Sequence, residues 1–269
     1  MTDSEFSRIV DFAAERYGIN LQQKKALVEK KMDSYLERKG YKSYDEYMNI
    51  VEYEMLGTEE QNFIDKITVN HTYFLREPEQ FYYLRDEILP ELKEKEISTK
   101  NLKIWCAGAS TGEEPYTIAM LIREFLGDDY EEWDTGLMAT DLSRKALEKA
   151  VKGIYKRQQL EGLPKHWVKD YFIKLNEKQC EVKQDIRKNV IFRQFNLINP
   201  FPFKNKLHVI FLRNVMRYLE DEVNRDLTER IRGFLEPGGY LILGMTESID
   251  PGAAKLEYLG SSIYRRPLA

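Results

Sequence analysis

Cysteine and histidine are scarce in this chain of 269 residues. The two cysteines, Cys106 and Cys180, cannot build a disulfide framework, and with only three histidines a usual zinc site is not expected. No apolar run approaches the roughly 20 residues needed to cross a bilayer, so membrane insertion is not expected either. The first residues lack the basic and apolar regions of a secretion signal. These absences predict a cytoplasmic protein without a metal centre.

A large excess of one charge is also absent, because 41 Lys and Arg residues are balanced by 45 Asp and Glu residues, for a net charge of −4. This balance argues against a dedicated nucleic-acid-binding protein. The distribution is uneven, since 43–65 holds seven acids and no Lys or Arg, whereas 151–194 holds eleven Lys or Arg and five acids. The basic stretch is interpreted either as a solvated surface or as a patch for an acidic partner.

The first hundred residues follow a helical pattern. Apolar residues recur at helical spacing with charged residues between them, as in Leu21, Val28, Met32 and Tyr35. The apolar period continues to Leu92 and is interrupted by Pro90, and no β-rich run precedes Leu102. We therefore predict a small all-helical N-terminal domain at 1–75 and a second domain at 76–269.

From Leu102 onward, short apolar strands alternate with helices. Strands are expected at 102–106, 136–140, 190–195, 207–212 and 240–243, with a closing hairpin at 256–265. Helices are expected at 113–125, 143–151 and 221–234. Such alternation predicts an α/β domain with a mainly parallel, doubly wound, Rossmann-like sheet. The polar, basic segment 155–189 breaks the alternation and is expected to be a small β insertion.

The turn after the first predicted strand indicates which kind of ligand the domain binds, because doubly wound sheets bind ligands beyond the carboxyl ends of their strands. Its glycines, Gly108 and Gly112, do not form the G-x-G-x-x-G of a dinucleotide site. Glu113 and Glu114 would repel a phosphate, so a phosphate-free ligand with a cationic end, such as S-adenosylmethionine (SAM), fits better. We assign Glu114 to a capping box with Thr111 and Glu113 to the ligand, although the pattern alone leaves the choice between the two acids open.

Asp141 ends the second predicted strand. An acid at this position can accept hydrogen bonds from both ribose hydroxyls of an adenosine. It lies 33 residues after Gly108, which is longer than the usual spacing of about 20. The alternative is a turn residue that precedes the helix cap Ser143.

Four sequence segments, taken in order, make the chain resemble a known family. They are N-H-T-Y-F-L-R-E at 70–77, S-T-G-E-E-P-Y at 110–116, F-L-R-N-V-M-R-Y at 211–218 and G-G-Y-L-I-L-G at 238–244. The chain resembles the bacterial chemotaxis receptor methyltransferases of the CheR type, which transfer a methyl group from SAM to glutamates of chemoreceptors. The likeness covers nearly the whole chain. His71 and the M-T-E-S at 245–248 depart from the family pattern but leave the strongest motif intact.

The resemblance implies a class I SAM-dependent methyltransferase, with S-adenosylhomocysteine (SAH) as the product. The residues expected to bind the cofactor are Asn70, Thr72, Arg76, Gly108, Glu113, Asp141, Asn196, Leu197, Arg213 and Asn214. Arg76 and Tyr218 are the expected catalytic residues. The implied partners are the cytoplasmic domains of chemoreceptors, and the enzyme is expected to be a monomer that binds no nucleic acid.

Methyl transfer to a carboxylate requires no general base, because a glutamate with a pKa of about 4.3 is already ionised at pH 7. The enzyme has to align oxygen, methyl carbon and sulfur and to exclude water. The planar fork of Arg76 suits a carboxylate of either the cofactor or the substrate. The hydroxyl of Tyr218 is expected to orient the incoming carboxylate.

Lys24, Lys31 and Arg38 recur every seven residues, so on a helix they drift by only about 20° per step. We expect a basic ribbon that docks on an acidic receptor bundle, and the alternative is a solvated helix flank. Binding of a receptor C-terminal peptide by the 155–189 insertion is left open. Two other functions for the whole chain also stay open: a SAM-binding adaptor without catalysis, and a methyltransferase that acts on RNA or a small molecule.

Overall fold

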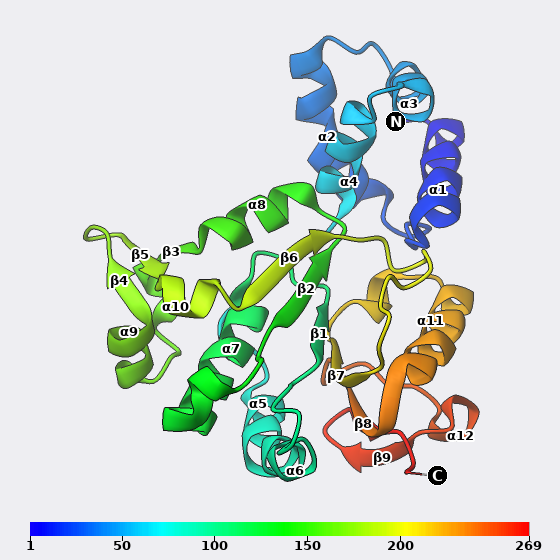
Figure 1. Ribbon diagram of the computed structural model, residues 1–269. Helices are drawn as coiled ribbons and strands as arrows, with labels where there is room; N and C mark the ends of the chain where they lie inside the picture. Colours follow the sequence, from blue (N-terminus) through cyan, green and yellow to red (C-terminus); the bar gives the residue numbers. More distant parts are fainter. Residues whose placement is uncertain (269) are drawn as a thin grey trace.

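Four helices form the first part of the chain, drawn in blue and cyan at the top of Figure 1, in a computed structural model that describes residues 1–268. They are α1 (Asp3–Tyr17), α2 (Lys25–Lys39), α3 (Tyr44–Tyr53) and α4 (Thr58–Ile67). Helix α1 begins at a capping box formed by Thr2 and Glu5 and ends at Gly18, which is in the left-handed conformation. Apolar side chains from the four helices are buried together, including Ile9, Met32, Tyr47 and Phe63. The expected all-helical N-terminal domain is confirmed.

Helix α2 begins one residue after Lys24, whose backbone is not helical (φ −117°, ψ 23°). Leu21 and Lys24 therefore precede the helix, although both Leu21 and Val28 are buried as expected. The segment before α2 crosses to the second domain, where Ile19 forms an antiparallel bridge with Leu219. The prediction of one helical set of apolar residues is thus wrong for Leu21, because α2 starts after this residue.

A continuous helical segment follows the linker between the domains. It consists of α5 (Pro78–Tyr83), the π-helix η1 (Leu84–Ile88) and α6 (Leu89–Lys95). Pro90 lies in the first turn of α6, just after the wider π-turn, where its missing N–H is tolerated. The interruption that was expected at Pro90 is therefore a local widening of the helix, and the helix does not end there. Phe81 and Leu92 from this segment are buried in the core on one face of the sheet.

In the described part of the chain, seven strands form the central sheet, in the order β6-β2-β1-β7-β8-β10-β9. Their bounds are β1 (Ile104–Ala107), β2 (Leu137–Asp141), β6 (Val190–Gln194), β7 (Leu207–Leu212), β8 (Leu235–Leu243), β9 (Glu257–Gly260) and β10 (Ile263–Arg265). The strands from β6 to β8 are parallel, and β10 pairs antiparallel with β8 and β9. Ile104 and Cys106 pack into one core, whereas Trp105 and Ala107 pack into the other. The mainly parallel, doubly wound sheet is confirmed.

Helices cover both faces of this sheet. They are α7 (Glu113–Leu126), η2 (Gly127–Glu132), α8 (Arg144–Lys152), η4 (Met216–Tyr218), α11 (Asp221–Phe234) and α12 (Pro251–Ala254). Helix α8 lies next to α4 of the helical domain (Figure 1). Strand β8 begins at Leu235, earlier than expected, because its first residues already pair with Leu207 across an irregular register. Within 1–268, no helix combines the length and apolar character needed to span a bilayer.

A second, three-stranded antiparallel sheet lies within the segment expected to form a β insertion. It has the order β3-β5-β4, with β3 (Ile154–Lys156), β4 (Phe172–Lys174) and β5 (Gln179–Val182). The short helices η3 (Arg157–Leu160), α9 (Lys165–Tyr171) and α10 (Gln184–Arg187) complete it. Tyr155 and Phe172 pack edge-on against Phe74, with ring centroids 4.9 and 5.6 Å away. The inserted sheet is therefore anchored on the linker between the two domains.

Candidate functional site

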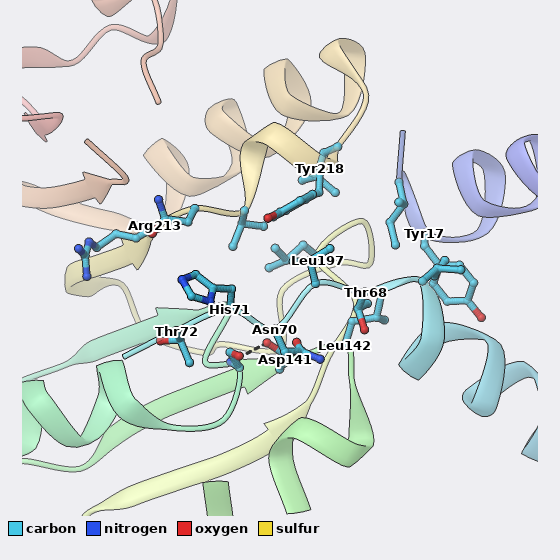
Figure 2. Close-up of a pocket in the computed structure, with 18 of the residues that line it drawn as sticks. Tyr17, Thr68, Asn70, His71, Thr72, Asp141, Leu142, Leu197, Arg213 and Tyr218 are labelled. Carbon is cyan, nitrogen blue, oxygen red and sulfur yellow. Dashed lines mark hydrogen bonds between the residues drawn. The ribbon is translucent and has the colours of Figure 1, made fainter. Parts of the chain in front are cut away.

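A pocket opens beyond the carboxyl ends of β1, β2, β6 and β7 and is closed on one side by the helical domain (Figure 2). The space between its lining residues is about 1210 Å³, a volume that includes open solvent at the mouth. Ten of the eleven predicted cofactor and catalytic residues line it. They are Asn70, Thr72, Arg76, Gly108, Asp141, Asn196, Leu197, Arg213, Asn214 and Tyr218. The sequence motifs therefore converge on one place, with Glu113 as the exception.

The turn after β1 has a strained backbone, with Gly108 at φ 115° and Ser110 at φ 48°. A Cβ on Gly108 would lie 2.4 Å from Val215 Cγ2, so only glycine lets this turn approach the loop after β7. Ser110 Oγ is buried and has no hydrogen-bond partner among residues 1–268, although Ser110 lines the pocket. A buried hydroxyl without a partner is costly, which favours a polar ligand beside it.

The two acids at the start of α7 point in different directions. Gly112, in the left-handed conformation, is the N-cap of α7, so the expected capping box between Thr111 and Glu114 does not form. Glu114 lines the pocket, whereas Glu113, which the sequence analysis assigned to the ligand, is not among the lining residues.

Glu113 is fully buried on the other side of the helix start. Its carboxylate accepts hydrogen bonds from Thr111 Oγ1 (2.6 Å) and Gln159 Nε2 (3.1 Å), and the Lys149 ammonium lies 3.8 Å away. Burial raises the pKa of Glu113, and these partners oppose that rise. Glu113 therefore joins the start of α7 to the segment that bears the inserted sheet.

Asp141 occupies the position expected of a ribose acceptor. It ends β2 and lines the pocket, and its two carboxylate oxygens accept hydrogen bonds from the backbone amides of Ser110 (2.7 Å) and Ser143 (2.8 Å). Burial raises the pKa of Asp141, while the two amides act in the opposite direction. Each oxygen retains a further lone pair, so the fixed carboxylate can still accept from a ligand.

Arg213, which follows β7, joins the start of α5 to the start of α7. Its side chain is fully buried and donates to Gln80 Oε1 (2.6 Å), to Glu77 Oε2 (3.0 Å) and to Glu114. The guanidinium lies 4.9 Å from the ring centroid of Phe81, and Figure 2 shows the side chain extending away from the pocket centre. Its donors are thus committed to protein groups, which leaves the backbone of Arg213 for any contact with a ligand.

Tyr218 lies in the short helix η4, facing the linker residue His71 across the pocket in Figure 2. The ammonium of Lys24 lies 5.3 Å from the centroid of the Tyr218 ring and donates to the Asn20 carbonyl (2.7 Å). Arg76 donates to the His71 carbonyl (2.8 Å), which shapes the linker. Lys24 was expected on a docking ribbon, but it lines the pocket because it precedes α2.

The residues present fit SAM. Asp141 offers a ribose acceptor, Ser110 offers a hydroxyl that is unpaired within residues 1–268, and Glu114 offers a carboxylate in the same pocket lining for a cationic group. Sequence reasoning missed Ser110 and Lys24. Ser110 belongs to a recognised motif, whereas no signal in the sequence places Lys24 before its helix. Within residues 1–268, no group of three or more His, Cys, Asp or Glu is arranged to hold a metal ion.

A doubly wound sheet, a pocket at its carboxyl edge and an acid at the end of β2 are the features of a nucleoside-binding α/β domain, a class that includes the SAM-dependent methyltransferases. The chain belongs to the CheR methyltransferase family: the SAM-binding domain of that family matches residues 70–264, and its all-alpha domain matches residues 4–68. The predicted family, fold class and cofactor are therefore confirmed.

Several relatives match over nearly their whole length. A chemotaxis protein methyltransferase from Borreliella burgdorferi is 37% identical over 270 residues, covering 99% of this chain and 95% of the relative. Chemotaxis protein methyltransferase 1 from Pseudomonas aeruginosa is 34% identical, covering 92% and 90% of the two chains. The Escherichia coli chemotaxis protein methyltransferase is 30% identical, covering 98% and 91%.

Proposed function

We propose that this protein transfers the methyl group of SAM to glutamate side chains of chemoreceptors, giving glutamate methyl esters and SAH for sensory adaptation. The observation that carries the proposal is the match, over both domains, to relatives named chemotaxis protein methyltransferases. The enzyme acts in the cytoplasm as a monomer, on the cytoplasmic domains of receptors and not on nucleic acid. Residues 1–75 form its receptor-docking domain, and residues 76–269 form its methyltransferase domain.

The cofactor side of the pocket binds and orients. When bound, SAM would supply a methyl group on a sulfonium sulfur, and a carboxylate oxygen would bond to the methyl carbon in line as the carbon–sulfur bond breaks and SAH leaves. Asp141 would accept hydrogen bonds from the ribose hydroxyls, Ser110 Oγ would form a further hydrogen bond, and Glu114, which also pairs with Arg213, would hold the cationic methionine end. Apolar residues of the helical domain, Ile19 and Leu21, form part of the wall and exclude water.

The acceptor side has cations and a hydroxyl but needs no base. Arg76 and Lys24 both line the pocket and give the incoming carboxylate an electrostatic guide. The Tyr218 hydroxyl donates a hydrogen bond that aligns one carboxylate oxygen with the methyl carbon. Because the glutamate is already ionised at neutral pH, this alignment is the main task of the protein.

Replacing Tyr218 by phenylalanine is expected to lower turnover about tenfold and to leave SAH affinity unchanged, because only the acceptor uses the hydroxyl. Steady-state kinetics on a receptor fragment and calorimetry with SAH measure the two quantities. Phenylalanine keeps the ring over which Lys24 lies, so packing is preserved. Normal turnover in this variant would assign Tyr218 to packing alone.

The proposed function itself is tested by transfer of radiolabelled methyl from SAM to a purified receptor cytoplasmic fragment. Label that is released by mild alkali is expected, because esters hydrolyse readily and N-methyl groups do not. Alkali-stable label, or label only on RNA or a small molecule, would move the enzyme to a different substrate. Cofactor binding without any transfer would favour the adaptor.

The three predicted docking residues lie in different surroundings. Lys31 donates to the Thr68 carbonyl (2.8 Å), and Lys24 is directed to the pocket, whereas Arg38 is exposed beside the Tyr35 ring. Burial lowers the pKa of both lysines. We therefore propose that Arg38 supplies the long-range attraction to an acidic receptor and that Lys24 acts inside the pocket.

Replacing Arg38 by glutamate is expected to raise the KM for receptor severalfold and to flatten its dependence on salt, because screened attraction is lost. Lys24→Ala is expected instead to lower kcat and to preserve the salt dependence. Both are measured by kinetics at two ionic strengths. A wild-type KM and salt response in Arg38→Glu would leave this residue without a docking role.

A further inference from the structure

A carboxylate of the helical domain, that of Asp65 in the last turn of α4, contacts the methyltransferase domain just outside the pocket lining. Asp65 Oδ1 accepts a hydrogen bond from Ser143 Oγ (2.7 Å) and a longer one from the backbone amide of Lys145 (3.3 Å). Both donors lie at the N-terminal end of α8, which belongs to the methyltransferase domain. An anion at this end of a helix is favoured by the helix dipole.

The same serine also holds Asp141. Ser143 is fully buried, its Oγ caps α8 by accepting from the Ala146 amide (3.1 Å), and its own amide donates to Asp141 Oδ1 (2.8 Å). A continuous chain of hydrogen bonds therefore runs from Asp65 through Ser143 to Asp141.

A second bridge between the domains runs beside the first. Gln194, at the end of β6, donates to the Leu142 carbonyl (3.1 Å) and to the side chain of Gln61 on α4. Leu142 lies between Asp141 and Ser143 and itself lines the pocket. The turn that carries Asp141 is thus held by α4 at two points.

We propose that Asp65 is a positioning residue, which places Asp141 for the ribose of the cofactor and thereby couples the seating of the helical domain to cofactor binding. The inference rests on the proposed placement of the cofactor and not on the identity of the methyl acceptor. It goes beyond the proposed function because it makes a residue outside the pocket lining set the affinity for SAM and SAH.

The coupling has a direct consequence for the enzyme. The helical domain also supplies one wall of the pocket, through Ile19, Leu21 and Lys24. A partner that shifts α4 against α8 changes the affinity for the cofactor, and by linkage the cofactor changes the affinity for that partner by the same factor. Docking and cofactor loading are therefore not independent events.

The negative charge of Asp65 and its hydrogen bonds have opposite expected effects on cofactor binding by Asp141. Substitutions that remove one but not the other can therefore distinguish the two effects. The Asp65 charge repels Asp141, so a role in charge alone would make Asp65→Asn bind the cofactor more tightly. The hydrogen-bonding role requires an acceptor oxygen, which asparagine retains and alanine does not. We expect Asp65→Asn to bind SAH within about threefold of the wild type and Asp65→Ala to bind it about tenfold more weakly.

The experiment is a double-mutant cycle on the full chain, with Asp65→Ala, Ser143→Ala and the double variant titrated with SAH by calorimetry. Both residues act on Asp141 through the hydrogen bond between Ser143 and Asp65. The double variant is therefore expected to bind SAH no more weakly than whichever single variant binds SAH less tightly. At saturating SAM, kcat is expected to stay near the wild-type value. Asp45→Asn is the matched control, since Asp45 is an exposed acid of the same domain that pairs with Arg8.

Two outcomes would overturn the proposal: wild-type SAH affinity in Asp65→Ala, or losses from the two single variants that simply multiply in the double variant. A lower melting temperature with unchanged SAH affinity is the first of these outcomes, because it assigns Asp65 to structure alone. Failure of the wild type to bind SAH would instead contradict the proposed cofactor site, and with it the proposed function.

Discussion

Replacing Asp141 by alanine is expected to weaken the binding of SAM and of SAH alike, by about ten- to a hundredfold. Both molecules carry the same ribose, and the loss of charge-assisted hydrogen bonds costs roughly 1.5–3 kcal/mol. The substitution also leaves the amides of Ser110 and Ser143 without their acceptor, which loosens the turns on both sides. Calorimetry with SAH measures the effect without the complication of turnover.

The pH dependence of SAH affinity provides a second test of the role of Asp141. Burial raises the pKa of Asp141, so its carboxylate takes up a proton at a higher pH than an exposed aspartate does. The protonated form is a poorer acceptor, and SAH affinity is therefore expected to fall on acidification in the wild type. The Asp141→Ala variant should lack this component of the pH dependence.

The control for this substitution is Asp134→Asn, which alters an exposed acid just before the same strand. Its SAH affinity is expected to equal that of the wild type. If Asp141→Ala keeps its fold and binds SAH normally, the ribose lies elsewhere and the placement of the cofactor has to be revised.

The position of Asp141 could be predicted because it depends only on where a strand ends. Apolar periodicity locates β2, and the carboxyl ends of parallel strands share one edge of the sheet. The same reasoning places Gly108, which follows the first strand, at that edge. Local patterns therefore predict the architecture, since each strand carries its own signal, whereas most of the pocket residues were expected only from the family resemblance.

The choice between Glu113 and Glu114 could not be predicted in this way. It depends on the exact residue at which α7 starts, and a shift of one residue turns each side chain by about 100°. The left-handed Gly112 sets that start and excludes the Thr111 capping box. Lys24 illustrates the same limit, because α2 begins one residue later than the heptad pattern assumes.

The roles of Arg213 and Asp65 depend on contacts between distant residues, which no local pattern reveals. Arg213 bonds Gln80 and Glu77, which are more than 130 positions away in the sequence. Asp65 bonds Ser143, which lies 78 positions away. Sequence reasoning identified Arg213 as part of the pocket, but only the fold shows which groups its guanidinium neutralises.

Replacing Arg213 by methionine is expected to lower the free energy of unfolding by about 3 kcal/mol. Methionine fills much of the same volume, but it leaves two carboxylates, those of Glu77 and Glu114, close together without their shared cation. It also leaves Gln80 Oε1 without a donor. Urea denaturation measures the change, with Arg217→Met as the control, since Arg217 is exposed and its ion pair with Glu247 is longer (3.7 Å).

The pH dependence of this loss of unfolding free energy shows whether Arg213 stabilises the fold by its charge or by its packing. Burial favours a higher pKa for Glu77, but the Met245 amide and the Arg213 guanidinium outweigh it, and the pKa is lowered overall. In the wild type, the stability from this group is present above the unfolded-state pKa of about 4.3 and is lost as the pH falls through the lower folded-state value. Without Arg213 the carboxylate loses a cation and protonates more readily. The gap between variant and wild type is therefore expected to narrow on acidification, and a gap that stays constant with pH would mean that Arg213 stabilises the fold by packing on Phe81 and not by its charge.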